Sequence, residues 1–343
     1  MKNKSITSFL VLIFLIGMSS QAQTYLNNFS HAINPRARII MDNDFGGDPD
    51  GLFQMAHHLL SPTIEVKAII CSITYPDGFY GYPGNPQYSS QMASELLKVM
   101  NLDRAYNVLE GAGEKLKDIK TPIETVAAKA IIEEAMRDDE KPLYMVCGAG
   151  LTNIASAWLM EPKIADRLTL IWIGGMEYEG LAWPPPGGSY NWEYNTGIDP
   201  IAAQVIFNQS DIPIWQVPRN AYRQALYSYA ELTYRVKDKG ETGAYLMDRL
   251  DDLLKRSNNT LGEAYVLGDS PLVLLTALQS SWEVDPSSSK YAMRTTPHVT
   301  KEGGFEENPE GRNIRVYDQL DVRLMFEDFV SKLVLFNNSN SSK

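Results

Sequence analysis

The chain has 343 residues, of which 44% are hydrophobic and 10% aromatic, so it can build a sizeable core and is not globally disordered. Its 31 Lys and Arg residues against 42 Asp and Glu give a net charge of −11, which argues against a binder of phosphate polymers. The two cysteines exclude a disulfide scaffold and a Cys-rich zinc protein, and the four histidines leave few imidazoles for a histidine-built metal site. A metal site in this chain is therefore expected to be rich in oxygen ligands.

The first 22 residues have the pattern of a secretory signal peptide. Two lysines precede an unbroken apolar run from Phe9 to Ile16, and the small residues Ser20 and Ala22 fit a cleavage site after Ala22. The run is too short for a membrane span, which needs ~20 residues. We expect export, with residues 23–343 forming one soluble domain in a periplasm or outside the cell.

Short apolar runs then alternate with helix-like segments. In chain order we predict strand Arg38–Met41, helix Gly51–Leu60, strand Glu65–Cys71, helix Ser89–Met100, strand Val108–Glu110, a helix opened by Thr121-Pro122, strands Leu143–Cys147 and Leu168–Ile173, helix Asp199–Phe207, strand Pro213–Val217, and helices Tyr222–Val236, Gly243–Lys255, Pro271–Leu278 and Leu320–Phe336. This order predicts an α/β fold with a mostly parallel central sheet flanked by helices. Ligands of such sheets bind at the carboxyl ends of the strands.

The segment after the first predicted strand is strongly acidic. Asp42, Asp44, Asp48 and Asp50 place four carboxylates within a nine-residue, Gly-containing stretch. Unpaired carboxylates this close repel one another, and a bound cation relieves the repulsion. Calcium accepts six to eight oxygen ligands from a flexible loop, so the segment favours Ca²⁺.

Other interpretations of the acidic segment fit its residues less well. An EF-hand needs Asp or Asn at the fifth position and Glu at the twelfth, where this chain has Gly46 and Phe53. A metal-dependent phosphatase could use Asp42 as its nucleophile, although Phe45 stands where a small hydroxyl residue is expected. The phosphatase remains an alternative, as does a solvated acidic turn.

Four motifs follow one another along the chain. Residues 38–48 resemble the pattern Asp-x-Asp-x-Gly-x-Asp. Residues 148–155, 193–203 and 268–272 resemble the patterns Gly-Pro-Leu-Thr-Asn-Ile-Ala, Glu-Phe-Asn…Asp-Pro-x-Ala-Ala and His-Asp-Pro-Leu. In this order the four motifs resemble those of the nucleoside hydrolases, in particular the inosine-uridine preferring type. The resemblance spans nearly all of the mature chain. It implies a Rossmann-like open sheet and calcium-dependent hydrolysis of the N-glycosidic bond of a ribonucleoside or related riboside.

The resemblance also implies roles for individual residues. Asp44 matches a metal ligand that also takes the proton of the attacking water. Because Pro49 interrupts an acidic pair of the family, Asp48 and Asp50 compete for one ligand position. The implied metal ligands are Asp44, Asp48 or Asp50, the backbone carbonyl of Thr152, and Asp269. The positions matching sugar-contacting residues are Asn85, Asn191, Glu193 and Asn195.

One position departs from the family pattern. Many members carry a His before the late Asp, where it can protonate the departing base, and this chain has Gly268 there. His57 and His58 lie inside the first predicted helix, where we expect packing or surface residues rather than acids. The aromatic loop from Trp183 to Trp192 could stack on a base or form a lid. The alternative function is therefore a catalytically weak or inactive riboside-binding relative.

Cys71 and Cys147 both end predicted strands, and we expect them to be buried structural thiols. The expected partner is a small-molecule riboside rather than a nucleic acid polymer or a membrane. A homo-oligomer and the identity of the base are left open.

Overall fold

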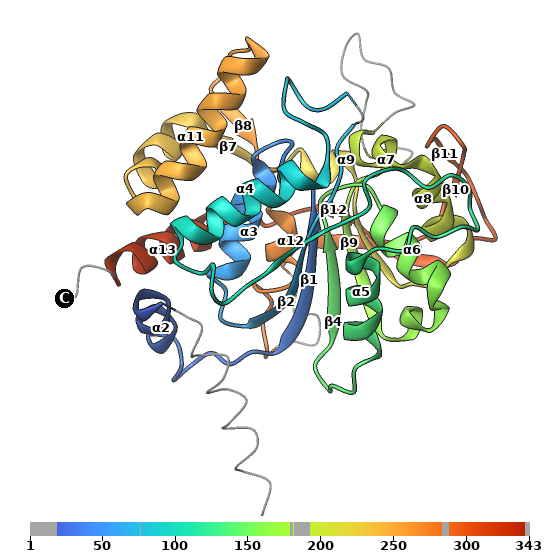
Figure 1. Cartoon of the computed structure of the whole chain (residues 1–343), viewed down its shortest axis with the longest axis horizontal. Helices are drawn as coiled ribbons and strands as arrows, with labels where there is room; N and C mark the ends of the chain where they lie inside the picture. The colour runs from blue at the N-terminus through green and yellow to red at the C-terminus, as the bar shows by residue number, and fades with distance from the viewer. Residues whose placement is uncertain (1–18, 76, 179–180, 182–192, 283–287, 340–343) are drawn as a thin grey trace, which may run out of the picture.

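A central sheet of eight strands organises the protein. The structure is a computed structural model (Figure 1), and it describes residues 19–75, 77–178, 181, 193–282 and 288–339. The strand order is β3-β2-β1-β4-β5-β6-β12-β9, and only β9 runs antiparallel to its neighbour. The strands are β1 Ala37–Asn43, β2 Ile64–Cys71, β3 Val108–Glu110, β4 Leu143–Cys147, β5 Leu168–Ile173, β6 Ile214–Val217, β9 Lys290–Thr295 and β12 Asn313–Gln319. The predicted α/β fold with a mostly parallel sheet is confirmed.

Helices cover both faces of the sheet, as its alternating buried side chains require. In β1, Ile39 and Met41 belong to one hydrophobic core and Ile40 to the other. The first core receives α2 Ser20–Asn27, α3 Asp50–Leu59, α4 Pro86–Val99, α11 Gly240–Ser257, α12 Pro271–Leu274 and α13 Val322–Asn338. The second core receives α5 Val126–Met136, α6 Thr152–Met160 and α8 Pro200–Gln204. None of the described helices is long and apolar enough to cross a membrane.

The order of the strands reverses between β1 and β4. From β1 the chain runs outward to β2 and β3, then returns to place β4 on the other side of β1, where Asp42 is the neighbour of Cys147. In open α/β sheets, such a reversal leaves a crevice at the carboxyl ends of the strands, which is where ligands bind. The acidic segment leaves β1 at this point.

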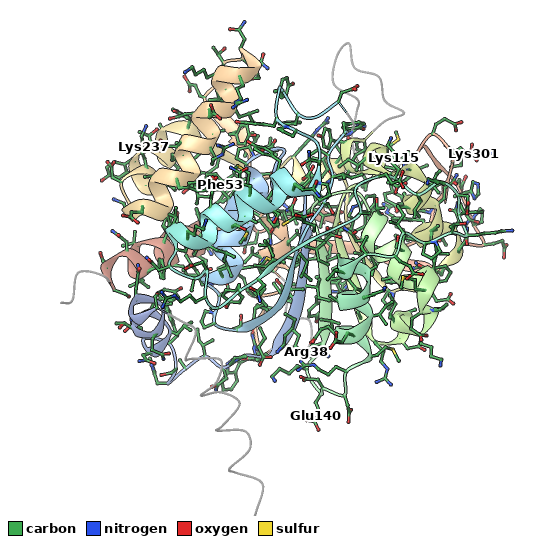
Figure 2. The ribbon with its side chains drawn as sticks, in the orientation of Figure 1. Arg38, Phe53, Lys115, Glu140, Lys237 and Lys301 are labelled. Carbon is green, nitrogen blue, oxygen red and sulfur yellow. The ribbon has the colours of Figure 1, made fainter. Side chains whose placement is uncertain are left out.

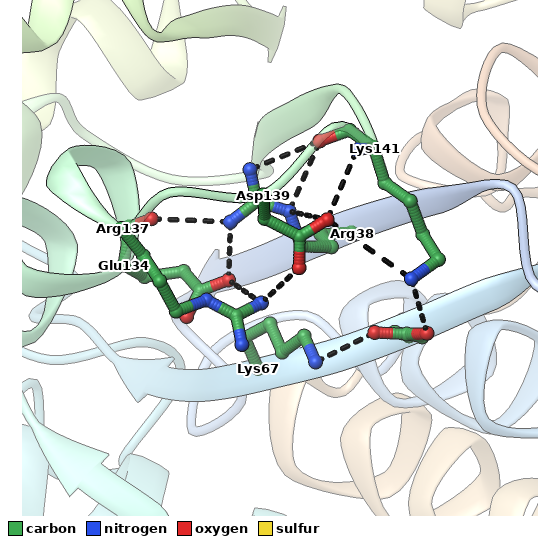
Figure 3. A network of polar contacts seen from close by, with 7 residues as sticks. Arg38, Lys67, Glu134, Arg137, Asp139 and Lys141 are labelled. Atoms are coloured by element: carbon green, nitrogen blue, oxygen red, sulfur yellow. Dashed lines mark hydrogen bonds and ion pairs between the residues drawn. The ribbon is translucent and has the colours of Figure 1, made fainter. Parts of the chain in front are cut away.

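The opposite end of β1 is fixed by an ion-pair network (Figures 2 and 3). The Arg38 guanidinium donates to Glu134 Oε1 at 2.6 Å and, through Nη2, to the carbonyl of Lys141 at 2.9 Å. Arg137 adds ion pairs to Glu134 at 2.9 Å and to Asp139 at 2.8 Å. Because the Arg38 side chain is almost completely buried, these bonds replace its lost hydration. The network holds the amino end of β1 against the end of α5 and the segment that enters β4.

The prediction of one helix over Tyr222–Val236 is wrong. The chain instead forms α9 Arg219–Tyr222, strand β7 Leu226–Ser228, α10 Tyr229–Leu232 and a π-helical segment, Thr233–Lys237. Leu226 is exposed and Tyr227 buried, a period of two that fits a strand, and β7 pairs antiparallel with β8 Ala264–Val266. This strand pair lies beside the carboxyl ends of the sheet, since Val266 lines the same cavity as Gly148, which follows β4.

Other predicted boundaries also change. The helix placed at Thr121-Pro122 begins at Val126, because the Thr125 side chain caps it by accepting from the Ala128 amide at 3.0 Å. The helix predicted over Pro271–Leu278 ends at Leu274. The remaining elements are the 3₁₀ helix Pro162–Asp166, α7 Tyr194–Ile198, the π-helical segment Val205–Gln209, and the short strands β10 His298–Val299 and β11 Phe305–Glu306.

Candidate functional site

A cavity of about 310 Å³ opens at the carboxyl ends of the central strands, and most of the predicted site residues line it. Four of its carboxylates come from two distant segments: Asp44, Asp48 and Asp50 from the loop between β1 and α3, and Asp269 from the residues before α12. Its other lining residues are Phe79, Gly148, Ile173, Glu193, Tyr194, Asn195, Tyr222, Arg223, Val266 and Gly268. The cavity has the size of a small-molecule site.

Burial makes the negative charge of these carboxylates unfavourable. It raises the pKa of Asp44 well above its usual value, and the charges of Asp269 and Asp48 raise it further. The pKa of Asp48 is raised to about 6 and that of Asp269 to about 7, again chiefly by burial. The pKa of Asp50 is raised well above its usual value for the same reason. A cation in the cavity would relieve this cost.

The chemistry of these side chains fits a hard cation, because every acidic group in the cavity offers carboxylate oxygens as metal ligands. In the described part of the chain, however, no group of three or more His, Cys, Asp or Glu side chains has the arrangement of a metal site. The protein side chains alone therefore define the ligand type but not a coordination geometry.

Asn43 connects the two acidic segments. Its Nδ2 donates to Asp269 Oδ2 at 2.8 Å and to Gln54 Oε1 at 3.3 Å, and its Oδ1 accepts from the Asp44 backbone amide at 2.8 Å. The Tyr265 hydroxyl donates to Asp48 Oδ1. These neutral donors orient the carboxylates without neutralising their charge.

Two glycines let the segments approach closely. A Cβ on Gly148 would lie 2.6 Å from Asp269 Oδ2 and 2.5 Å from Asn43 Nδ2, so a side chain there would displace both. A Cβ on Gly268 would lie 3.2 Å from Asp50 Oδ2, which already accepts from the Asp269 amide at 3.2 Å. Asp50 thus borders the space that a residue with a side chain at position 268 would enter.

Asp42 lies behind the cavity rather than in it. Its carboxylate is fully buried, accepts from the Ser72 hydroxyl and accepts from Asn153 Nδ2 at 3.1 Å. Burial raises the pKa of Asp42 to about 7 although both hydrogen bonds lower it. A nucleophile must reach its substrate, so this position argues against a phosphatase that uses Asp42.

Glu193 and Asn195 lie at the start of α7 and line the cavity. Glu193 Oε2 accepts from the Gly175 amide at 2.8 Å and from both the amide and hydroxyl of Thr196 at 3.0 Å. Asn195 Nδ2 donates to the carbonyls of Gly148 at 3.1 Å and Ile173 at 2.8 Å. Because both amide hydrogens are used in this way, Asn195 would contact a ligand through Oδ1, as an acceptor.

Two other predicted site residues are not among those that line this cavity. Thr152 is the first residue of α6, and its hydroxyl donates to Asp199 Oδ2 at 2.7 Å. Asn85 caps α4 by accepting from the Tyr88 amide at 2.8 Å and lines a separate cavity of about 670 Å³. Asn191, together with the whole aromatic loop at 183–192, lies outside the described residues.

The structure adds cavity residues that the sequence did not indicate. Tyr222 and Arg223 follow the carboxyl end of β6, so the strand-end rule could have pointed to them. Phe79 comes from the long loop after β2, and its ring centroid lies 5.9 Å from that of Tyr194. Tyr265, which contacts Asp48 from strand β8, had no sequence signal, because no element was predicted there.

None of the described histidines lines the cavity. His57 pairs with Asp328 at 2.8 Å, and His58 with the Thr276 hydroxyl at 2.9 Å, so both are buried structural residues as predicted. His298 is exposed in β10. Cys71 and Cys147 are buried free thiols, and burial raises the pKa of each.

Comparison with known proteins identifies the family. The model of the inosine-uridine preferring nucleoside hydrolase family matches residues 39–327, and the chain belongs to this family. The chain is 33% identical over 147 residues to an inosine-uridine preferring nucleoside hydrolase of Leishmania major and 39% identical over 92 residues to one of Crithidia fasciculata. These matches cover 40% and 26% of this chain, and 43% and 26% of the two relatives.

Solved structures agree on the fold. An inosine-guanosine nucleoside hydrolase aligns with a TM-score of 0.67 at 17% identity, over 87% of this chain and 98% of its own. A plant nucleoside hydrolase aligns with a TM-score of 0.65 at 18% identity, over 88% and 99%. An inosine-uridine preferring nucleoside hydrolase from Bacillus anthracis aligns with a TM-score of 0.63 at 15% identity, over 87% of this chain and 99% of its own. The predicted family resemblance is confirmed.

Proposed function

We propose that the protein hydrolyses the N-glycosidic bond of a ribonucleoside or related riboside in a calcium-dependent reaction. The observation that carries the proposal is the meeting of four carboxylates from two distant segments in one cavity, beside Glu193 and Asn195. The cavity lies at the reversal of strand order, where α/β sheets bind their ligands. Family membership supports the same reaction.

In the proposed site, Asp44, Asp269, the Thr152 carbonyl and either Asp48 or Asp50 hold Ca²⁺. The ion would supply an anchor for the ribose hydroxyls and lower the pKa of a bound water. Asp44 acts as general base toward the attacking water, since its carboxylate lines the cavity beside the other proposed metal ligands. The acidic cavity favours the positive charge that develops on the sugar.

The sugar is held by polar residues at the cavity wall. Asn195 accepts a hydrogen bond from a ribose hydroxyl, and Glu193 contributes the second contact near it. Asn191 is a further proposed sugar contact, whereas Asn85, whose side chain caps α4 and lines a separate cavity, is not included. A site built to bind hydroxyls rejects a sugar that lacks one, because its buried polar groups are then left unpaired. Ribosides should therefore be preferred over 2′-deoxyribosides.

A catalytically weak riboside-binding relative is the second candidate. One observation favours it: Gly268 offers no proton donor, and no described histidine lines the cavity. An enzyme without a leaving-group acid cleaves ribosides with good leaving groups far better than natural nucleosides.

The test compares 4-nitrophenyl riboside, inosine and uridine, each with Ca²⁺ and with a chelator. We expect hydrolysis that Ca²⁺ supports and that Asp44→Asn lowers by at least about 1,000-fold. The exposed Asp211→Asn is the matched control and should keep full activity. Riboside binding without hydrolysis of any substrate would overturn the proposal in favour of the binding relative.

We also propose export, with cleavage after Ala22 leaving residues 23–343 as the mature domain. Cleavage there falls within α2 and removes the bond from Gln21 Nε2 to the Phe336 carbonyl, but it keeps Tyr25, which is buried against the core. Amino-terminal mass spectrometry of the protein expressed with its full leader should find Gln23 as the first residue. A cytoplasmic, uncleaved chain would contradict the proposal.

A further inference from the structure

We propose that Arg223 stabilises the departing base, the task for which Gly268 provides no side chain. The inference rests on the proposed riboside hydrolysis. Among the described residues that line the acidic cavity, Arg223 is the only basic one. It lines this cavity together with its neighbour Tyr222 and with Gly268, and a Cβ on Gly268 would lie 3.5 Å from the Tyr222 ring. The cation therefore belongs to the same wall as the position that lacks an imidazole.

The guanidinium of Arg223 is held near the cavity without being fully engaged by an acid. Its nearest carboxylate is Glu177 Oε1, at 3.6 Å, which is longer than a hydrogen bond. Glu177 is already paired with Arg219, whose Nε donates to Oε1 at 2.5 Å and whose Nη2 contacts Oε2. The Arg223 side chain is 41% exposed to solvent, so its N–H groups can still reach a ligand.

Tyr222 is committed to another contact. Its hydroxyl donates to Glu193 Oε1 at 3.1 Å, and burial with the adjacent Glu193 charge raises its pKa well above the usual value. Tyr222 thus serves to orient Glu193. Arg223 is left as the cavity residue that can meet negative charge on a leaving group.

The chemistry balances without a proton from the protein. As the C1′–N bond breaks, its electron pair moves to the base nitrogen and spreads to a carbonyl oxygen of the base. Arg223 donates N–H hydrogen bonds to that oxygen and stays protonated, as guanidinium does in proteins. The attacking water bonds to C1′ and gives its proton to the general base, and solvent protonates the released base. The products are ribose and the neutral base.

This arrangement selects a class of substrate. Bases with a ring carbonyl that takes up the charge, of the uracil or hypoxanthine type, gain most from Arg223. Adenine carries no ring carbonyl and gains least. The protein should therefore cleave uridine and inosine faster than adenosine.

The test measures kcat/KM on uridine, inosine and 4-nitrophenyl riboside for Arg223→Met, Arg223→Lys and the exposed control Arg104→Met. We expect Arg223→Met to lower the values for uridine and inosine about 100-fold, with a loss within about threefold on 4-nitrophenyl riboside, whose leaving group needs little stabilisation. Arg223→Lys should recover part of the loss, because it keeps the charge.

Two results would overturn the inference while leaving the proposed function intact: an equal loss on all three substrates, or no loss on any. Thermal melting of each variant separates these results from misfolding. If the wild-type protein cleaves none of the ribosides, the proposed function fails first and the inference fails with it.

Discussion

Asn43 Nδ2 donates a 2.8 Å hydrogen bond to Asp269 Oδ2, joining residues 226 positions apart in the sequence. The same nitrogen contacts Gln54 Oε1 at 3.3 Å, and Gln54 in turn contacts His58 Nδ1. The fully buried polar chain thus runs from the acidic cavity into α3. Its effect is to fix the orientation of Asp269 through neutral donors.

Asn43→Asp tests this relationship. The substitution replaces a donor by a second carboxylate beside Asp269, so the two side chains repel each other. We expect the Ca²⁺ concentration for half-maximal activity to rise about 10- to 100-fold, as when a hydrogen-bond partner of a metal ligand is lost. The exposed Asn27→Asp, with the same change of charge, should match the wild type. An unchanged Ca²⁺ requirement in Asn43→Asp would show that Asp269 is not held this way.

Tyr265→Phe tests which acid of the first loop binds the metal. The Tyr265 hydroxyl donates to Asp48 Oδ1, so its removal disturbs Asp48 directly. If Asp48 is the ligand, half-saturation by Ca²⁺ should rise about 10-fold, measured by calorimetry or by activity. Tyr227→Phe is the matched control, because the buried Tyr227 hydroxyl has no hydrogen-bond partner among the described residues. Equal affinities in both variants would assign the ligand role to Asp50.

His57→Gln tests the pH dependence of stability. Burial lowers the pKa of His57 to about 4. The unfolded chain, with an ordinary pKa near 6.5, therefore binds the proton more readily than the folded one. The stability that His57 contributes is complete above pH about 6.5 and is lost as the pH falls toward 4, by up to roughly 3 kcal/mol.

Urea unfolding at pH 7.5 and pH 5 measures this effect. His57→Gln should lose less stability between the two pH values than the wild type, whereas the exposed His298→Gln should lose as much as the wild type. The buried carboxyls with raised pKa values stabilise the folded state as the pH falls, which is the opposite dependence. Because all three proteins contain these carboxyls, their contribution cancels when the losses of stability are compared. An identical loss in all three would contradict a neutral, buried His57.

Tyr25→Phe tests how firmly α2 is held. The Tyr25 hydroxyl donates to the Leu60 carbonyl at 2.6 Å, and its ring packs edge-on against Phe336 with centroids 5.5 Å apart. Losing a buried hydrogen bond should lower the free energy of unfolding by about 1–2 kcal/mol while activity is kept. Tyr234→Phe, at a residue that is 82% exposed, should change nothing. Equal stability of the two variants would mean that α2 is only loosely attached.

Secondary structure could be predicted best from the sequence where the residue pattern is local and uniform. Leu143–Cys147 and Leu168–Ile173 match β4 and β5 residue for residue, because strands buried on both faces read as nearly continuous apolar runs. The prediction failed around Tyr222–Val236, where short elements of different type follow one another without a Gly or Pro between them. Strands β9 and β12 were not predicted at all. They join the sheet because β12 pairs with β6 and β9 pairs with β12. These long-range contacts are not encoded in the local sequence pattern.

The candidate site shows the same division. Asp44, Asp48 and Asp50 could be found because they follow a strand in one short acidic stretch. The position of Arg223 after β6 could be found by the same rule, but its proposed role could not, because that role depends on where Glu177 and Arg219 leave its guanidinium. A side chain whose role is set by its neighbours' pairings is visible only when the three-dimensional contacts are known.

The close approach of Gly268 and Asp50 also constrains how this protein can change. A histidine introduced at position 268 would place its Cβ 3.2 Å from Asp50 Oδ2, so the carboxylate would have to shift by a few tenths of an ångström. The substitutions tolerated at position 268 therefore depend on the side chain at position 50. A directed-evolution library that varies position 268 alone would sample crowded variants, whereas a library that varies both positions could reach an imidazole-bearing protein in two steps.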